Sequence, residues 1–86
     1  MEFKRHVKWR TEKFGAVIFE TLKEKLFITN DIGADILKGI GEGKAADEIV
    51  RELAEIYNCD KAVIQKDVNE YIASLTQNGI IAGETE

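Results

Sequence analysis

The sequence predicts one α+β domain in which three strands precede three helices. From residue 7 to residue 29, apolar residues alternate with polar ones or form short continuous runs, which is typical of strands. From Asn30 onward they recur every three or four positions, which is typical of helices. Apolar residues make up 44% of the 86 positions and charged residues 33%, a composition that supports a folded core. A chain of this length has no room for a second core.

Three segments are expected to form an antiparallel sheet. Residues 7–11 alternate apolar and polar side chains and should bury one face. Residues 14–20 are apolar nearly throughout and β-branched in the middle, so they are expected to be buried on both faces. Gly15 within them indicates a bulge or the close approach of another backbone. Residues 25–29 follow after only four residues, which favours an antiparallel hairpin over residues 14–29.

Three helices are expected, at residues 31–41, 46–57 and 61–78. Each is bounded by residue types that favour helix ends, because side-chain oxygens accept from the first free N–H groups and Gly or Asn adopts the left-handed conformation that ends a helix. These residues are Asn30 or Asp31 with Gly41 and Gly43 for the first helix, Asn58 for the end of the second, and Asp60 with Gly79 for the third. After Gly79, Ile80 is expected to pack on Leu75 in a Schellman motif, and Ile81 to help cover the core.

The helices are expected to bury one apolar stripe each. The stripes are Ile32, Ile36, Leu37 and Ile40 in the first helix, Ile49, Leu53, Ile56 and Tyr57 in the second, and Ile64, Val68, Tyr71, Ile72 and Leu75 in the third. A small antiparallel sheet packed on three helices is also the composition of a winged helix-turn-helix whose wing comes first.

The residue types offer little support for catalysis or for a metal. A structural zinc site needs about four Cys or His ligands, and this chain has one histidine, His6, and one cysteine, Cys59, on different elements. Neither is accompanied by a third residue that would orient a nucleophile and its base. We expect His6 to be exposed and Cys59 to be a small buried residue. We therefore expect no metal, no cofactor and no enzymatic activity.

The charge distribution argues against nucleic acid as a partner. Twelve Lys and Arg face sixteen Asp and Glu, for a net charge of −4, whereas proteins that bind phosphates usually carry a net positive face. No apolar run reaches the roughly 18 residues of a bilayer-spanning helix, so no membrane is expected. A single cysteine excludes an internal disulfide framework, so the expected compartment is a reducing cytoplasm.

Basic residues are concentrated between Lys4 and Lys13. They are expected either to protect an edge strand from aggregation or to steer an acidic partner toward the protein. In the second case added salt should weaken binding.

The strand at residues 25–29 is the best candidate for a binding surface. It carries one charge, at Lys25, and the apolar set Leu26, Phe27 and Ile28. At an edge of the sheet it could accept a peptide as an added strand, whereas a central or helix-covered strand could not. Val63 lies about 120° from the centre of the third helix's apolar stripe, so it is either a partner contact or an isolated exposed apolar residue.

Four segments, in this order, resemble the PqqD-like family. They are residues 10–19 (R-x-E-x-F-G-x-x-x-F), residues 26–37 (L-F-x-x-N-x-x-G-x-x-I-L), residues 47–53 (similar to E-E-I-x-x-x-L), and residues 67–81 (D-V-x-x-x-(I/L)-x-x-L-x-x-x-G-(I/L)-(I/L)). The resemblance covers residues 7–81. The early strands lack the proline that relatives often carry, and no iron–sulfur or S-adenosylmethionine motif is present.

This resemblance implies a RiPP recognition element, a winged-helix-like domain that binds the leader of a ribosomally synthesised precursor peptide. Residues 1–86 would form one such domain. The leader would add as an antiparallel strand to residues 25–29, in a groove bounded by the third helix. The implied peptide-binding residues are Lys25, Leu26, Phe27, Ile28 and Thr29 on the strand and Val63, Ile64, Asp67, Val68 and Tyr71 on the helix. Which alternate strand residues face the groove is left open, because a shift of one residue inverts the set.

The resemblance also implies a partner enzyme that matures the precursor peptide. For members with the Phe14-Gly15 opening this is often a radical S-adenosylmethionine enzyme, and for others it is a leader protease. Two different functions are left as alternatives. One is a winged-helix DNA-binding protein that would use Arg51, Lys61, Gln65, Lys66 and Asn69. The other is a small regulatory subunit that binds a protein but no leader, and a homodimer is also left open.

Overall fold

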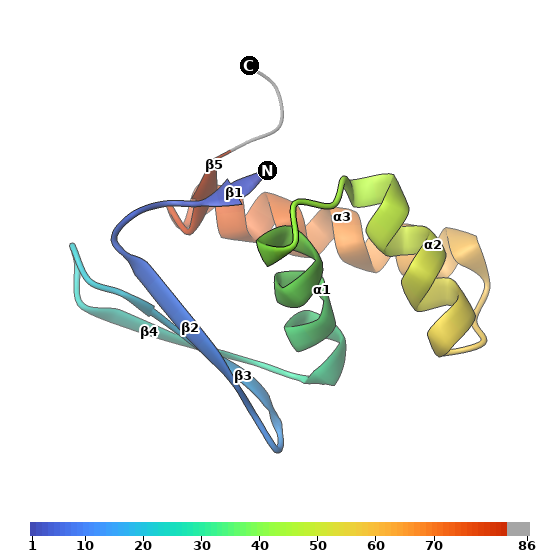
Figure 1. Cartoon of the computed structure of the whole chain (residues 1–86), viewed down its shortest axis with the longest axis horizontal. Coiled ribbons are helices and arrows are strands. Elements are labelled where there is room, and N and C mark those ends of the chain that lie inside the picture. The colour runs from blue at the N-terminus through green and yellow to red at the C-terminus, as the bar shows by residue number, and fades with distance from the viewer. Residues whose placement is uncertain (83–86) are drawn as a thin grey trace.

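The computed structural model describes residues 1–82 and confirms the α+β class. A three-stranded sheet lies to one side and the three helices to the other (Figure 1). The elements are β1 (Glu2–Phe3), β2 (Val7–Glu12), β3 (Gly15–Glu20), β4 (Lys25–Thr29), α1 (Asp31–Gly41), α2 (Ala46–Ile56), α3 (Lys61–Gln77) and β5 (Ile81–Ala82). The ends of the three longer strands and the three helices differ from the expected ends by at most one residue.

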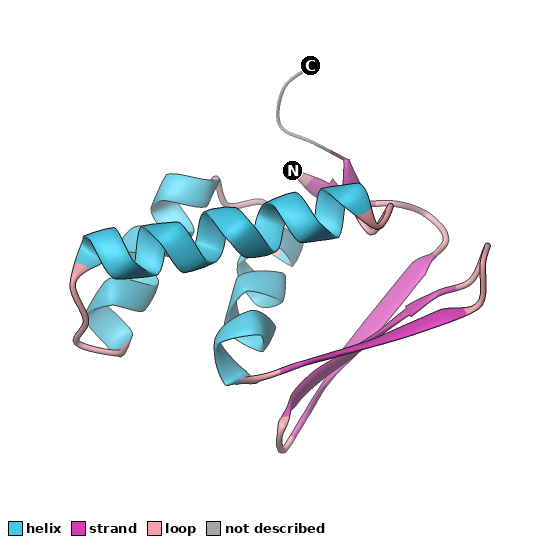
Figure 2. Cartoon of the chain, turned by 180° about the vertical axis from the view of Figure 1, so that it is seen from behind, coloured by secondary structure: helices cyan, strands magenta, loops and turns pink. Residues whose placement is uncertain are grey.

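The larger sheet has the strand order β2-β3-β4, and both neighbouring pairs are antiparallel. The hairpin expected over residues 14–29 is therefore confirmed, and β4 is an edge strand. The helices lie on one side of this sheet in both views (Figures 1 and 2), with α1 packed against β3.

Only one face of β3 is buried, so the expectation of burial on both faces is wrong. Ala16 and Ile18 point toward the helices and are 0% exposed, whereas Phe19 on the opposite face is 43% exposed. Phe14, in the turn before the strand, is also exposed. The reason is that no second layer formed by residues 1–82 covers the outer face of the sheet.

The core forms where the buried face of the sheet meets the apolar stripes of the helices. Its helical members largely follow the expected pattern, with one exception in α2, where Ile56 is exposed and Val50 is buried. The buried face of α2 is centred between Leu53 and Val50, so Ile56 falls at its margin in the last turn. The buried apolar residues are Ala16, Ile18, Ala34, Ile36, Leu37, Ile40, Ile49, Val50, Leu53, Ile64, Val68, Leu75, Ile80 and Ile81.

The third helix ends as expected. The N–H of Ile80 donates to the carbonyl of Leu75 (2.9 Å), and that of Gly79 donates to Thr76 (3.1 Å), which is the Schellman pattern. Gly79 has a φ of +74°, which favours glycine. Equivalent bonds follow α1 and α2, with Gly43 and Asn58 at the left-handed position.

The N-cap of the first helix is Asn30 rather than Asp31. The Asn30 side chain accepts a hydrogen bond from the N–H of Gly33 (2.9 Å). Asp60 caps α3 in the same way through the N–H of Ala62 (3.0 Å). Because Asn30 directly follows β4, the cap fixes the angle at which the chain passes from the edge strand into the helix.

A second, two-stranded sheet joins the two ends of the described chain, and the sequence pattern does not predict it. β1 pairs antiparallel with β5, with Phe3 opposite Ile81. The ring of Phe3 packs on that of Trp9, with ring centroids 5.6 Å apart. Ile80 and Ile81 are buried, which confirms that they cover the core. Two-residue strands carry no periodicity, so only their tertiary pairing defines them.

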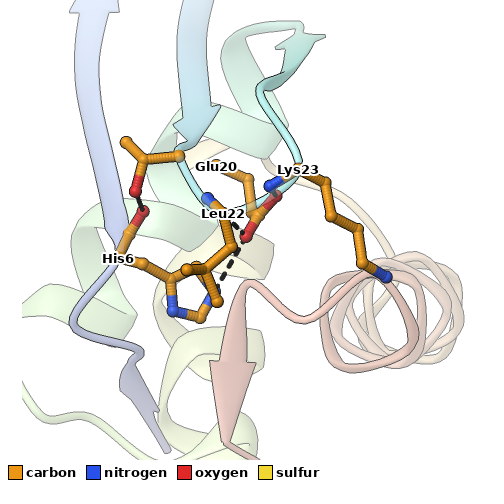
Figure 3. A network of polar contacts seen from close by, with 5 residues as sticks. His6, Glu20, Leu22 and Lys23 are labelled. Atoms are coloured by element: carbon orange, nitrogen blue, oxygen red, sulfur yellow. Dashed lines mark hydrogen bonds and ion pairs between the residues drawn. The ribbon is translucent and has the colours of Figure 1, made fainter.

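Glu20 is a buried carboxylate, 4% exposed, at the end of β3. It accepts hydrogen bonds from the N–H groups of Leu22 (3.2 Å) and Lys23 (3.0 Å), and it lies 3.0 Å from Nε2 of His6 (Figure 3). The expectation that His6 is exposed is therefore wrong, since its side chain is mostly covered in this pair. The network ties the turn between β3 and β4 to the segment that leads into β2.

None of the helices within residues 1–82 has the length and apolar character that crossing a bilayer requires.

Candidate peptide-binding groove

The edge strand β4 is the centre of the candidate site. One of its sides pairs with β3, and no strand of residues 1–82 occupies the other side. Its main-chain groups on that side are therefore available to an added strand. The sequence left open whether residues 25–29 form an edge strand or a central one, and the structure shows an edge strand.

The register of the sheet decides which side chains of β4 face the helices. Paired residues share a face, and Phe27 pairs with the fully buried Ile18. Lys25, Phe27 and Thr29 therefore lie on the helix side, whereas Leu26 and Ile28 lie on the outer face. The exposed fractions agree, since Leu26 is 60% and Ile28 is 68% exposed while Phe27 is half-buried against the core.

The helix α3 forms the opposite wall of the groove. Asp67 and Tyr71 line a hollow of about 330 Å³ together with Thr29 and the start of α1. Val63 lies one turn earlier on the same side of the helix and is exposed. Ile64 and Val68, which the family resemblance also placed in the site, are 2% and 0% exposed. Their side chains belong to the core and present no surface to a partner.

Two glycines position the end of β4. A Cβ on Gly15 would lie 2.0 Å from the carbonyl oxygen of Thr29, and a Cβ on Gly33 would lie 1.7 Å from Oγ1 of the same threonine. Gly15 also has a φ of +148°, which few other residues adopt. The close backbone approach expected at Gly15 is thus present, and its partner is the edge strand that bounds the groove.

Tyr71 connects the two walls of the groove. Burial raises the pKa of its hydroxyl, and the side chain of Thr29 beside it acts in the opposite direction to a smaller extent. The tyrosine therefore stays neutral at physiological pH and offers a hydroxyl that can both donate and accept a hydrogen bond.

A second hollow lies at the other end of β4. It measures about 530 Å³ and lies between Lys25, the turn before β4 and the C-terminal end of α3. Sequence reasoning did not place this hollow in the site, because its lining comes from segments that are distant in the chain. The lining residues are Lys4, His6, Glu20, Leu22, Lys23, Lys25, Thr76, Gln77, Asn78 and Gly79.

The outer face of the sheet carries exposed apolar side chains. Val17, Phe19 and Leu26 line a shallow hollow of about 350 Å³ that is bordered by Lys8 and Arg10. The basic residues between Lys4 and Lys13 therefore lie on two different surfaces of the structure. Lys4 lies at the second hollow, whereas Lys8 and Arg10 lie on the outer face.

Within residues 1–82 no three His, Cys, Asp or Glu side chains gather as metal ligands would. Cys59 is exposed in the connection between α2 and α3, so the expectation that it is buried is wrong. Its thiol lies within hydrogen-bonding distance of the carbonyl of Tyr57 (3.3 Å). The turn that ends α2 directs this side chain away from the core.

Comparison with protein families identifies a match over most of the chain. The model of the family described as Coenzyme PQQ synthesis protein D (PqqD) matches residues 15–81. No curated protein sequence matches the chain.

Three solved structures are similar in fold. TbiB1 in complex with the TbiA(β) leader peptide has a TM-score of 0.90 at 20% identity, with all of both chains covered. Lasso peptide synthetase B1 complexed with its leader peptide has a TM-score of 0.83 at 18% identity, covering 92% of this chain and 93% of that one. The PqqD truncation of Methylobacterium extorquens PqqCD, described as a stand-alone RiPP recognition element, has a TM-score of 0.75 at 24% identity, covering 92% and 84%. At these identities the likeness establishes the fold.

Proposed function

This chain belongs to the PqqD family, and we propose that it is a non-catalytic protein that binds the leader of a ribosomally synthesised precursor peptide by β-strand addition. In this role it presents the precursor to a maturation enzyme. Residues 1–86 act as one recognition domain in the cytoplasm, where such precursors are synthesised. Support comes from the two similar structures described as leader-peptide complexes and from the third, described as a recognition element.

The observation that carries this proposal is the unpaired edge of β4 beside the wall formed by α3. An added strand would place alternate side chains toward Phe27 and Thr29 on the groove side and beside Leu26 and Ile28 on the outer face. Main-chain pairing supplies affinity for any extended segment, and the groove supplies selectivity. Because a leader is flexible, binding orders it at an entropic cost, and moderate affinity is expected.

We further propose that the maturation enzyme is a radical S-adenosylmethionine enzyme. The Phe14-Gly15 opening that the chain shares with part of the family supports this choice, and Phe14 is exposed and accessible to a partner. The outer face of the sheet stays open when the groove is filled and offers this enzyme an apolar surface. The alternative partner is a leader protease. A pull-down with candidate enzymes of both classes distinguishes the two.

The first test is a titration of isotopically labelled protein with the leader of the precursor peptide encoded nearest its gene, followed by amide chemical shifts. Saturable shifts at residues 25–29 and 61–71 are expected. Duplex DNA is the control, since shifts only with DNA would favour the winged-helix alternative. A complex with the maturation enzyme that survives deletion of the leader would favour the regulatory-subunit alternative.

Strand addition has its own signature in the leader. An added strand directs every second N–H toward the edge of β4, so N-methylation should weaken binding about tenfold at alternate leader positions and little between them. Equal effects at all positions would contradict strand addition.

The helical wall is tested with a matched pair of variants. Val63→Ala should weaken leader binding a few-fold, whereas Ile56→Ala should not. Both side chains are exposed, so neither change should affect folding. Val63 lies on the side of α3 that lines the groove, whereas Ile56 lies on α2.

A further inference from the structure

The two ends of the groove carry opposite charge. At the Thr29 end the charged side chain that lines the hollow is Asp67. At the Lys25 end three lysines line the hollow, Lys4, Lys23 and Lys25. We call these the acidic end and the basic end of the groove.

The charge of the basic end is not cancelled by its surroundings. Within residues 1–82, none of the three lysines takes part in an ion pair. Glu20 also lines this hollow, but its carboxylate is already bound by His6 and by two backbone N–H groups. The C-terminal end of α3 contributes roughly half a negative charge at most, and its Schellman bonds satisfy part of that. A net positive potential therefore remains at this end. Asp67 at the other end likewise has no ion-pair partner within the described residues.

The strand and helix directions determine which end of an added peptide lies at each charged end of the groove. β4 runs from Lys25 to Thr29, while α3 runs from the turn of Asp67 and Tyr71, beside Thr29, to Thr76 and Gln77, beside Lys25. The whole sheet is antiparallel, and antiparallel pairing is slightly more stable than parallel pairing. A peptide that pairs antiparallel with β4 therefore has its N-terminal end at the acidic end of the groove and its C-terminal end at the basic end.

The spacing of the charges follows from the register. Lys25, Phe27 and Thr29 share the groove side, so the peptide residues opposite them also face the groove and are two positions apart. The first of these residues lies by Thr29 and Asp67, the second by Phe27, and the third by Lys25 and the other lysines of the basic end.

We propose that the groove selects a leader segment with the order basic–x–apolar–x–acidic from N- to C-terminus, read by Asp67, Phe27 and the lysines of the basic end. The proposal rests on the proposed function and adds the charge order of the bound peptide. Lys4, Lys23 and Lys25 are then specificity-determining residues.

The test uses three capped ten-residue peptides in a Ser/Thr background, which carry Lys-x-Leu-x-Glu, Glu-x-Leu-x-Lys or Gln-x-Leu-x-Gln at the centre. Affinities are read from amide shifts of residues 25–29 at low salt. Since two favourable exposed charge contacts replace two unfavourable ones, Lys-x-Leu-x-Glu should bind about tenfold more tightly than its reverse, with the neutral peptide between them. The difference should largely disappear at 0.5 M NaCl.

A pair of protein variants links the effect to the groove. Combining Lys25→Glu with Asp67→Lys should abolish the difference between the two charged peptides, because the Thr29 end becomes positive while Lys4 and Lys23 still leave the Lys25 end with one net positive charge. Lys61→Glu makes the same change of charge as Lys25→Glu at a lysine outside both hollows, and it should leave the order unchanged.

The outcomes separate this proposal from the one on which it rests. Equal binding of all three peptides at residues 25–29 would overturn the charge order and leave strand addition standing. Preference for Glu-x-Leu-x-Lys would overturn the direction. If none of the peptides shifts residues 25–29, and the precursor leader does not either, the proposed function fails together with this proposal.

Discussion

Replacing Gly15 by alanine should both unfold the edge of the sheet and abolish leader binding. The new Cβ would lie 2.0 Å from the carbonyl oxygen of Thr29 and 2.5 and 2.6 Å from the carbonyl carbon and oxygen of Asn30. All three are backbone atoms, so no side-chain rotation can relieve the overlap. Either Gly15 or the Thr29–Asn30 segment must move by about 1.5 Å to restore normal van der Waals separations.

The free-energy loss can be built from the contacts at stake. A non-glycine residue at the observed φ of +148° costs about 1–3 kcal/mol. Moving Thr29 weakens its pairing with Ala16, worth about 1 kcal/mol. Moving Asn30 weakens the cap on Gly33, worth a further 1 kcal/mol or so. Together these changes should lower the free energy of unfolding by about 3–5 kcal/mol, which is much of the stability expected for a domain of this size.

Gly43→Ala is the matched control, because Gly43 also has a positive φ (+80°) but no atom lies within 4 Å of the Cβ that would be added. It should cost only the conformational part, about 1–2 kcal/mol. Urea unfolding monitored by circular dichroism measures both variants, and the leader titration follows on whichever folds. If Gly15→Ala is no less stable than Gly43→Ala, the close approach to β4 does not constrain the fold as the structure indicates.

Three further predictions concern the framework that holds the groove. Glu20→Ala should lower the free energy of unfolding by about 2–3 kcal/mol, because it leaves two backbone donors and His6 without their acceptor. A loss below about 0.5 kcal/mol in urea unfolding would mean that water takes the place of the carboxylate. Ile18→Ala should lose about 3 kcal/mol, whereas Phe19→Ala, one residue along on the outer face, should lose less than about 1 kcal/mol; similar losses would contradict a sheet covered on one face. The hydroxyl of Tyr57 donates to Asp35, and this bond, with burial, raises its pKa from 10.0 to about 12. Tyr57→Phe should therefore lose about 1 kcal/mol at pH 8, and its difference from the unmodified protein should fade as pH rises from 10 toward 12, where the folded tyrosine ionises; a constant difference would contradict the assignment.

Local residue patterns were sufficient to predict the helices and strands and most of their ends. The end of α3 is the clearest case, because Gly79, Ile80 and Leu75 form a Schellman motif whose bonds lie within six consecutive residues. The caps at Asn30 and Asp60 are local in the same sense. The exposed position of Val63 also followed from helical geometry alone.

Local patterns failed where the outcome depended on a second layer. The apolar run of β3 fits a strand buried on both faces, and its sequence carries no information about whether anything covers the outer face. The exposures of His6 and Cys59 were also predicted wrongly, because each depends on a neighbouring part of the structure and not on the residue type. His6 is mostly covered because it pairs with Glu20, which lies fourteen residues away in the sequence. Cys59 is exposed because the turn that ends α2 directs its side chain outward.

The sequence by itself determined the order of strands and helices, their ends, and the candidate strand at residues 25–29, because each of these depends on residues that are neighbours in the chain. Only the tertiary structure decided that β4 lies at an edge, that Phe27 and Thr29 rather than Leu26 and Ile28 face α3, and that Ile64 and Val68 belong to the core. It alone brought Lys4, Lys23 and Lys25 to one end of the groove. The physical reason is that register, layer packing and charge clustering are long-range properties, set by which surfaces meet when the chain closes on its core.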